Sequence, residues 1–446
     1  MTASIRLHVR ETATIGMAVS LTVISILHKT LTNVKSKIAY RQTAREVVRN
    51  CLQCLTNKGK YTKIMMNIST YIRHFWRRKS SKTGCAAILS HKREGKSVSC
   101  VSGQDSVETL LAGRMKIRFT EVCQMSFSIL GTGKAVPDYV LTNDELSTMV
   151  ETNDEWIRTR TGIEERRVCK GETLTELTVK AATNALADAG IQPSELDLII
   201  CSTMRGENIT PSQACVIQKE IGAACPAFDV NAACSGFIYA LDIADGYFVR
   251  KKVKYVLVVS MDNLSNIIDW SDRSTCVLFG DGGAAAVLGE GDDLLSINLT
   301  AVGNDQVLRI PHGTNSSPFY EHEEERAVLF MAGNEVYKFA VNAMSTGIKK
   351  AIADAGLTEE QVDHVIPHQA NIRIINASAK NLGIDREKFY CNVNHYGNTS
   401  SGSVPLALDE ANHAGILKKG DIIAMCAFGA GLTTGSCVIR WSKDAQ

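Results

Sequence analysis

The sequence predicts an α/β protein whose main part contains two similar halves. After Met125, short aliphatic runs alternate with stretches of helical periodicity, which is the pattern expected when strands and helices alternate along the chain. Residues 185–200 also align without gaps with residues 351–366, and seven of the sixteen positions are identical. In both copies a helix is expected to end at Ala-Gly, with a turn and an apolar strand after it.

A second, looser repeat occurs in the same order. The Gly-rich residues 278–288 and 427–439 each lead into a strand-like run of small residues. Within this region, residues 421–428 have the length and the apolar continuity of a buried strand. We therefore divide the main part into an N-terminal half, residues 125–296, and a C-terminal half, residues 297–446.

Residues 1–124 differ in character from the rest of the chain. They hold 22 Lys and Arg against 6 Asp and Glu, a net charge of +16, whereas residues 125–446 carry a net charge of −14. All eight prolines lie after Met125, so the turn residues of a compact domain belong to the acidic part alone. We interpret residues 1–124 as a basic extension, either a disordered tail or sequence translated upstream of a start at Met125.

Three features of this extension suggest further functions, but simpler interpretations account for each. The apolar residues 15–27 are too few to cross a bilayer, and no clear cleavage site follows, which argues against membrane insertion and secretion. Cys51 and Cys54 form a C-x-x-C pair without a second pair at zinc spacing. The basic residues 73–82 could bind nucleic acid or anionic lipid, but a disordered tail or upstream translation explains them better, so we expect no nucleic-acid partner.

The composition narrows the class of protein. With 45% apolar and 22% charged residues, the chain of 446 residues is not wholly disordered. Its fourteen cysteines stand at irregular spacings, unlike the dense pattern of a small disulfide-bonded secreted domain. We expect most of them to be buried free thiols, and we expect the protein to be cytoplasmic.

One cysteine lies in a pattern that suits a nucleophile. Residues 228–248 begin as a strand, pass through small residues and continue with helical spacing, which places Cys234 at a strand-to-helix turn. The N–H groups and the dipole at a helix N-terminus both favour a thiolate. Cys234 is therefore the best nucleophile candidate, although a small buried cysteine in a tight turn would give the same local pattern.

Two residues of the second half can complement this cysteine. His368 follows the repeated strand, and Asn398 precedes another helical stretch. The carboxyl ends of strands are where sites gather in α/β sheets. Alone, His368 would suit a structural role and Asn398 a helix cap, but together with Cys234 they indicate a catalytic group.

These residues lie within motifs that resemble β-ketoacyl-acyl carrier protein synthase III, a thiolase-fold condensing enzyme that starts fatty acid synthesis. The resemblance covers residues 125–440, and the motifs occur in the family's order. They are LGTG (130–133), NDEWIRTRTGIEERR (153–167), PAFDVNAACSGF (226–237), FGDGGAAAVL (279–288), MAGNEVYKFAV (331–341), VIPHQAN (365–371), HYGNTSSGSVP (395–405) and FGAGLTTG (428–435).

The resemblance implies a thiolase-like fold, with two duplicated α/β halves in a layered α-β-α-β-α core, and a homodimer. It implies a catalytic triad of Cys234, His368 and Asn398. In the family, a primer acyl group moves from coenzyme A to the cysteine, and malonyl-acyl carrier protein then condenses with it and loses carbon dioxide. The histidine and the asparagine donate to the oxygen where enolate charge develops, so no metal or cofactor is expected.

The resemblance also assigns the residues that contact the substrates. The backbone N–H groups of Cys234 and Ala430 would form an oxyanion hole, although a third glycine is common in the family where Ala430 stands. Thr210 would form the partner-subunit wall of the acyl pocket, where acetyl-specific members often have Phe, so the primer length stays open. The implied coenzyme A contacts are Thr152, Trp156, Arg160, Arg273 and Asn371, and the implied carrier protein docking residues are Lys338, Arg373 and Lys380.

Other functions fit parts of the pattern. Cys, His and Asn also serve papain-like proteases, but the C-G-S-C-W type of signature that those proteases carry around the cysteine is missing here. A thiolase-fold relative that primes a secondary-metabolite pathway, or that joins two acyl chains, has the same residues. A carrier-binding module without activity is disfavoured by the intact triad. The Gly-rich FGDGG and FGAG segments match no phosphate-binding motif, so we interpret them as packing turns.

Overall fold

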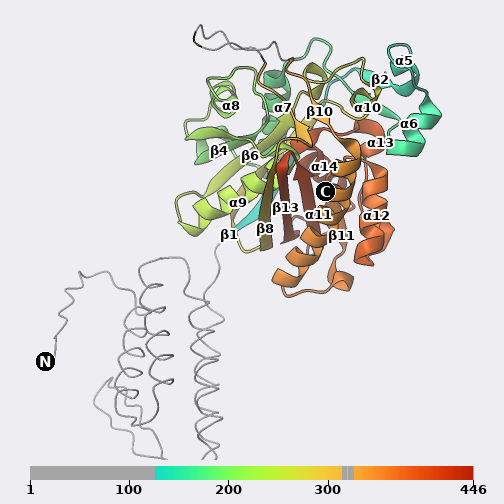
Figure 1. The fold of residues 1–446 in the computed structure, drawn as a ribbon. Coiled ribbons are helices and arrows are strands. Elements are labelled where there is room, and N and C mark those ends of the chain that lie inside the picture. Colours follow the sequence, from blue (N-terminus) through green and yellow to red (C-terminus); the bar gives the residue numbers. More distant parts are fainter. Residues whose placement is uncertain (1–125, 314–318, 320–325, 445–446) are drawn as a thin grey trace, which may run out of the picture. The chain divides into compact units, whose positions relative to one another are not determined.

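The computed structural model describes residues 126–313, 319 and 326–444 (Figure 1). The basic extension, with residues 15–27, the Cys51 and Cys54 pair and residues 73–82, lies outside the described residues, as does Met125.

Five strands of the N-terminal half form the first sheet. They are β1 (Ser126–Ala135), β4 (Leu198–Ser202), β5 (Ala227–Val230), β6 (Tyr255–Asp262) and β7 (Gly282–Gly291). Their order is β1-β7-β6-β4-β5, in which β7 is antiparallel to both neighbours and the β6-β4-β5 part is parallel.

Four strands form the second sheet. They are β8 (Leu294–Asn304), β11 (His364–Pro367), β12 (Ile422–Gly429) and β13 (Gly431–Arg440). Read as β8-β13-β12-β11, this sheet repeats the order and the strand directions of β1-β7-β6-β4, including the single parallel pair β12-β11. Where the first sheet has its fifth strand, β5, the second sheet has one isolated parallel bridge, between Val365 and Phe389. The boundary predicted between residues 296 and 297 falls inside β8, because the chain changes sheets between Gly291 and Leu294.

Six longer helices cover and separate the two sheets. They are α7 (Leu174–Ala189), α8 (Gln213–Ile221), α9 (Gly236–Val249), α11 (Gly333–Asp354), α12 (Ile372–Leu382) and α14 (Ser403–His413). Helices α7 and α8 pack on the outer face of the first sheet, and α11 packs on the second sheet with α12 beside it. Helices α9 and α14 contact strands of both sheets and so form the middle layer (Figure 1). The five-layer α-β-α-β-α order that the sequence predicted is confirmed.

Shorter elements complete the described part. The strands are β2 (Val140–Thr142), β3 (Glu165–Arg167), β9 (Leu308–Arg309) and β10 (Phe330–Met331). The helices are α5 (Asn143–Leu146), α6 (Asp154–Thr161), α10 (Arg273–Cys276) and α13 (Val393–Tyr396). The 3₁₀ turns are η1 (Pro193–Glu195), η2 (Ala233–Ser235), η3 (Leu264–Asn266), η4 (Glu359–Gln361), η5 (Arg386–Lys388) and η6 (Ser400–Gly402).

The aligned repeat has the local structure that its sequence predicts. Helix α7 begins with a capping box between Thr173 and Glu176, and it ends at Gly190, whose φ of 66° is a left-handed conformation that glycine adopts readily. Turn η1 and strand β4 follow. In the second copy, α11 ends just before Gly356, whose φ is 73°, and η4 and β11 follow.

The middle layer holds the largest apolar cluster. Phe237 and Leu241 of α9 and Leu408 of α14 are fully buried, together with Val258 of β6 and Met425 of β12. Full burial of one such side chain contributes roughly 1.5–3 kcal/mol. Both helices are therefore held against both sheets, which fixes the positions of the turns η2 and η6 from which they begin.

Two global expectations can be compared with the described residues. The nine cysteines there are free, and six of them are buried, as expected. No helix in this part of the chain is long and apolar enough to span a membrane.

Candidate active site

Cys234 lies in the turn η2, between β5 and α9, as the sequence predicted. Ala233, the first residue of this turn, has a φ of 47°, in the left-handed region that is unfavourable for residues with a Cβ. The end of β12 packs closely against the turn, because a Cβ on Gly429 would come within 2.6 Å of the backbone N of Cys234. The cysteine is buried, with 9% of its surface exposed.

Asn398 lies just before η6, the corresponding turn of the second half. Its backbone N donates to the carbonyl of Leu278 (2.8 Å), and its own carbonyl accepts from the N–H of Gly280 (3.1 Å). Its side-chain Oδ1 accepts from the backbone N of Ser400 (2.8 Å) within the turn, whereas the N-caps of η6 and α14 are Thr399 and Gly402, so Asn398 is not the helix cap considered from the sequence. Because the oxygen is engaged, the amide's NH₂ group is the part of the side chain that can donate.

Ser400 is the first residue of η6, and it has a φ of 53°. It therefore matches Ala233 in both position and conformation, since each begins the turn that leads into a middle-layer helix. Its Oγ donates to the Sγ of Cys234 (3.4 Å). The two strained turns thus meet at the nucleophile.

His368 follows β11 directly. Its backbone N donates to the carbonyl of Cys426 (2.7 Å), which extends the pairing of β11 with β12. The ring lies edge-on to Phe428 with 5.0 Å between centroids, and its Nδ1 is 2.6 Å from the Oγ of Ser403. Since Ser403 begins α14 immediately after η6, one short segment from Asn398 to Ser403 connects all three members of the predicted triad.

Burial determines the protonation of both titratable groups of the triad. It raises the pKa of the Cys234 thiol to about 12, and the negative charge of Asp262 acts in the same direction, while the hydrogen bond from Ser400 lowers it. The expectation that the helix N-terminus would favour a thiolate is therefore wrong for the free site, because desolvation outweighs it. Burial also lowers the pKa of His368 to about 3, so its ring is neutral at physiological pH.

Asp262, at the end of β6, is the buried carboxylate whose charge raises the pKa of Cys234. Burial raises its pKa, and hydrogen bonds from its neighbours lower it. It accepts from Met204 N (2.8 Å), from Thr203 Oγ1 (3.1 Å) and from the hydroxyl of Ser401 (3.0 Å). Asp262 therefore fixes η6 against the first sheet.

The Gly-rich segments are packing turns, as the sequence suggested. A Cβ on Gly280 would lie 2.3 Å from the carbonyl oxygen of Tyr396, and one on Gly283 would lie 2.1 Å from that of Ser260. Ala430 is the single residue between β12 and β13, and its carbonyl accepts from Thr433 Oγ1 (3.0 Å). Since Gly429 contacts the backbone of Cys234, Ala430 is one residue from that contact.

The residues expected to contact coenzyme A form one surface cluster. The guanidinium of Arg273 lies 4.9 Å from the ring centroid of Trp156, and that of Arg160 lies 6.0 Å from it. Asn371 caps α12 and donates to the carbonyl of Arg160 (3.1 Å). The Thr152 hydroxyl is buried and has no hydrogen-bond partner among the residues that the structure describes. Because Trp156 and Arg273 contact each other directly, a flat ring could stack between them only after they separate.

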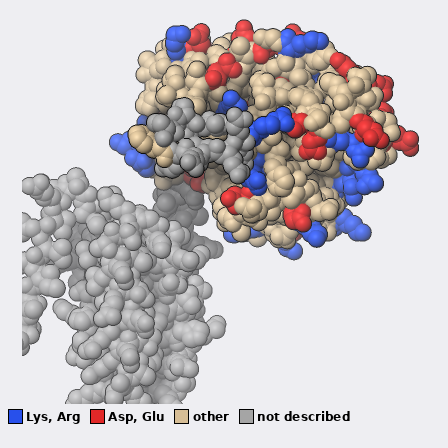
Figure 2. Space-filling view, turned by 45° about the horizontal axis from the view of Figure 1, so that its top comes forward, with Lys and Arg blue, Asp and Glu red and all other residues tan. Residues whose placement is uncertain are grey.

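The residues expected to dock a carrier protein lie on two neighbouring helices. Lys338 is exposed on α11, and Arg373 and Lys380 are exposed on α12, seven residues apart as the sequence suggested. Arg373 lies over the ring of Tyr337, with 5.6 Å to the centroid. On the face drawn in Figure 2, basic and acidic side chains are interspersed.

Thr210, expected in the wall of the acyl pocket, is exposed in the loop between β4 and α8. Its neighbour Ile209 is also exposed, at 97% of its surface. The part of the loop that carries Ile209 and Thr210 is therefore open to solvent.

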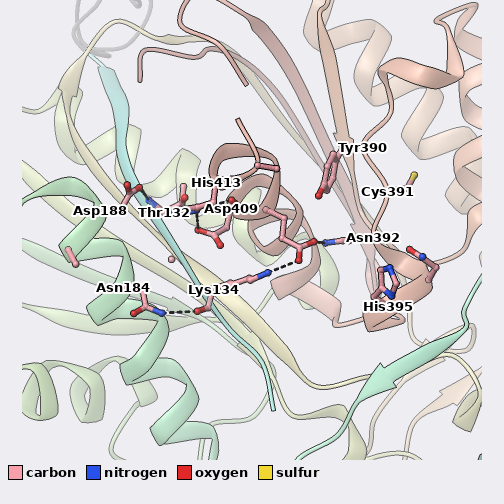
Figure 3. A pocket seen from close by; sticks show the side chains of 15 residues that line it. Thr132, Lys134, Asn184, Asp188, Tyr390, Cys391, Asn392, His395, Asp409 and His413 are labelled. Carbon is pink, nitrogen blue, oxygen red and sulfur yellow. Dashed lines mark hydrogen bonds and ion pairs between the residues drawn. The ribbon is translucent and has the colours of Figure 1, made fainter. Parts of the chain in front are cut away.

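A large groove lies elsewhere, between β1, α7, α14 and the segment around Asn392 (Figure 3). Its volume is about 1020 Å³, and none of the triad residues lines it. Lys134 forms an ion pair with Glu410 (2.6 Å) in this groove, and the Nδ1 of His413 lies 3.1 Å from the carboxyl of Asp409. Cys391 lines the groove and its Sγ accepts from the guanidinium of Arg386 (3.1 Å), but burial raises the pKa of this thiol, so the thiol form is favoured. Among the described residues, no cluster of His, Cys, Asp and Glu could hold a metal ion.

Sequence reasoning missed Ser400, Ser403 and Asp262. The two serines lie in the motif that carries Asn398, and polar residues directly before an apolar helix were the available signal. Asp262 follows a long apolar strand, and an acidic residue at the carboxyl end of such a strand is a recognisable pattern. Their partners, however, lie far away in the sequence.

Comparisons with known proteins show which family the chain belongs to. Profiles of the family described as 3-Oxoacyl-[acyl-carrier-protein (ACP)] synthase III match residues 228–303, and those of its C-terminal region match residues 352–441. The β-ketoacyl-[acyl-carrier-protein] synthase III of Clostridium acetobutylicum is 46% identical over 324 residues, which cover 71% of this chain and 99% of that protein.

Solved structures give the same result. The crystal structure of 3-oxoacyl-[acyl-carrier-protein] synthase III from Aquifex aeolicus VF5 matches with a TM-score of 0.66 and 45% identity, covering 71% of this chain and 100% of that one. The priming β-ketosynthase from the R1128 polyketide biosynthetic pathway matches with a TM-score of 0.67 and 35% identity, covering 72% of this chain and 97% of that one. The fold is thiolase-like, and the chain belongs to the β-ketoacyl-[acyl-carrier-protein] synthase III family.

Proposed function

We propose that the protein transfers a primer acyl group from acyl-coenzyme A to Cys234 and condenses it with malonyl-acyl carrier protein, giving 3-oxoacyl-acyl carrier protein and initiating fatty acid synthesis. The observation that carries this proposal is the buried segment from Asn398 to Ser403. It contacts the sulfur of Cys234 through Ser400 and the ring of His368 through Ser403. A nucleophile and two neutral donors are what such a condensation needs.

In the first half-reaction, the sulfur of Cys234 attacks the thioester carbon of the primer. The carbon–sulfur bond to coenzyme A breaks, and the proton of Cys234 leaves with coenzyme A as its thiol. Because burial raises the pKa of Cys234, the proton departs as the new bond forms, not from a standing thiolate. The backbone N–H groups of Cys234 and Ala430 are the proposed donors to the oxyanion.

In the second half-reaction, malonyl-acyl carrier protein loses carbon dioxide and forms an enolate. The enolate carbon attacks the acyl carbon on Cys234, and the cysteine leaves as a thiolate that takes a proton from solvent. We assign His368 and the NH₂ group of Asn398 as donors to the enolate oxygen. Neutral His368 suits this role because its lowered pKa keeps it a single, fixed donor. The scheme uses no metal and no organic cofactor.

The substrates and assembly follow from the same proposal. Trp156 and Arg273 would separate to hold the adenine of coenzyme A, with Thr152, Arg160 and Asn371 along the entrance. For the carrier protein, the proposed docking residues are Lys338, Arg373 and Lys380. We further propose a homodimer in which Thr210 faces the partner's acyl pocket, and a cytoplasmic location, which suits the free cysteines.

A second candidate function is priming of a polyketide pathway, which the R1128 relative carries out according to its description. Fatty acid initiation is preferred, because identity to that relative is 35% against 46% to the curated synthase of Clostridium acetobutylicum.

A primer panel tests the proposal. The full chain is incubated with malonyl-acyl carrier protein and one of several acyl-coenzyme A primers, and the products are resolved by mass. We expect 3-oxoacyl-acyl carrier protein that is longer than the primer by two carbons. Release of free acid without condensation would indicate a hydrolase instead.

A further inference from the structure

We propose that two serines of the segment from Asn398 to Ser403 each serve one half-reaction. Ser400 is a catalytic residue that donates a hydrogen bond to the sulfur of Cys234, and Ser403 is a positioning residue that sets the tautomer of His368. The expected changes in the two half-reactions rest on the proposed function. The expected changes in the alkylation of Cys234 and in the protonation of His368 rest on the two contacts alone.

Ser400 is built into its position. It is fully buried, its backbone N is held by the Oδ1 of Asn398, and its φ of 53° is maintained against the preference of a residue with a Cβ. Its Oγ lies 3.4 Å from the sulfur of Cys234. A hydroxyl at this distance donates most strongly when the sulfur is negative, as in the attack on the primer and in the departure of the cysteine.

Asp262 competes for the same proton, because the side chain of Ser400 also lies within hydrogen-bonding reach of this carboxylate. Its Oδ1 already accepts from Thr203 and Met204, and its Oδ2 accepts from both the hydroxyl and the backbone N of Ser401. With four other donors, Asp262 does not need Ser400. The Ser400 proton can therefore turn to the sulfur as charge develops there.

Ser403 determines which nitrogen of His368 carries the proton. The backbone N–H of Gln369 donates to the Oγ of Ser403 (3.3 Å), so this oxygen is already an acceptor. In the proposed arrangement, its own proton is donated to the Nδ1 of His368, 2.6 Å away. Because burial keeps the ring neutral, the ring's single proton resides on Nε2. Contact with Phe428 fixes the ring plane, so Nε2–H is a directed donor and cannot act as the base for Cys234.

Two variants of the full chain separate these roles. Ser400→Gly removes the hydroxyl at a position whose φ suits glycine, and Ser403→Ala removes the other hydroxyl from the start of α14. Each variant is the matched control for the other. The readouts are acylation of Cys234 from acetyl-coenzyme A by intact mass, and carbon dioxide release from malonyl-acyl carrier protein by pre-acylated enzyme.

For Ser400→Gly, we expect about tenfold slower acylation, the usual scale for one hydrogen bond to a charged group. The pH profile of Cys234 alkylation by iodoacetamide should move to higher pH. Among the described residues, the groups that act on this thiol are the hydroxyl of Ser400 and the carboxylate of Asp262, and Gly429 of β12 packs against its backbone. An unchanged alkylation profile would overturn the role of Ser400.

For Ser403→Ala, we expect acylation within about twofold of the wild type and carbon dioxide release reduced about tenfold or more. In ¹⁵N-histidine-labelled protein, the His368 signals should change from a pure Nε2–H tautomer to a mixture. A wild-type spectrum with the proton on Nδ1 would overturn the role of Ser403, and so would a variant that loses both half-reactions equally.

The alkylation and NMR readouts need no substrate. If the wild type condenses no primer, the proposed function fails while both contacts can still be tested. If the wild type is active but both readouts are unchanged in the variants, this inference fails alone.

Discussion

The hydroxyl of Ser400 donates to the sulfur of Cys234 over 3.4 Å, and the two residues come from corresponding turns of the two halves. Turn η2 leads into α9, and turn η6 leads into α14. Ala233 and Ser400 begin these turns with similar left-handed φ values of 47° and 53°. The duplicated fold thus brings two equivalent strained turns together, one with the nucleophile and the other with groups that support it.

The roles proposed for the triad predict different losses in the two half-reactions. Cys234→Ser should abolish acyl-enzyme formation, because a serine hydroxyl without a paired base is a poor nucleophile. His368→Ala and Asn398→Ala should still accept the primer but lose condensation by about 10² or more, the usual scale for one charge-stabilising donor. Intact-mass detection of the acyl-enzyme and release of carbon dioxide measure the two steps separately.

The outcome for His368→Ala decides between two mechanisms. If this variant cannot be acylated although it folds, His368 is the base that activates Cys234, and the division of roles is wrong. Asn398→Ala is the control, because it removes a donor on the same side of the reaction without removing a titratable group.

The lowered pKa of His368 predicts an unusual pH profile. An ordinary histidine gains its proton as the pH falls through 6.5, whereas burial lowers this pKa to about 3. The neutral donor therefore persists as the pH falls, and it is lost only near the lower value. Carbon dioxide release by pre-acylated enzyme should show no step assignable to His368 over roughly pH 5 to 8. A step near the ordinary value that is present in the wild type and absent in His368→Ala would contradict this prediction.

The repeat and the strand-to-helix turn at Cys234 were predicted from local sequence patterns, whereas the five layers and the triad followed from the resemblance to the family. The Ala-Gly helix ends at Gly190 and Gly356 and the strand-to-helix turn at Cys234 are all encoded by neighbouring residues. The pKa of Cys234 could not be predicted in this way. It depends on burial between the two halves and on Asp262, whose distance from the thiol only the folded chain determines.

The same limit applies to the substrate contacts. The sequence grouped Trp156 with Arg273 by resemblance, but it could not indicate that the two side chains touch each other. Contacts between residues 117 positions apart depend on how α10 packs beside α6, which no local pattern encodes.

The close approach of β12 to the nucleophile can be tested at Gly429. A Cβ there would lie 2.6 Å from the backbone N of Cys234, so Gly429→Ala should displace η2. We expect acylation to slow by about 10² or more, the usual cost of a misplacement near 1 Å. Gly303→Ala is the control, because nothing lies within 4 Å of its Cβ position. Equal activity of the two variants would show that η2 tolerates this displacement.

Carrier protein docking can be tested by reversing one charge. Arg373→Glu should raise KM for malonyl-acyl carrier protein several-fold, because acyl carrier proteins are acidic and residues 125–446 are themselves net negative. Primer transfer from coenzyme A should barely change. Lys349→Glu is the matched control, since Lys349 is also exposed but lies three turns beyond Lys338 on α11. Equal effects in both half-reactions would argue for a folding or entrance defect instead of docking.

The length of the primer is predicted to depend on Thr210. Its side chain is smaller than the Phe expected in acetyl-specific relatives, and its exposed loop could reach the partner subunit. The wild type should therefore accept primers of more than two or three carbons. Thr210→Phe should reduce kcat/KM for the longer primers by about tenfold and retain acetyl transfer. This scale is expected because a pocket discriminates by about 1–3 kcal/mol per methylene. Asn208→Phe, in the same loop, controls for added bulk alone. A strict acetyl preference of the wild type across the acyl-coenzyme A panel would refute the proposed role of Thr210, because the smaller side chain would then leave the primer length unchanged.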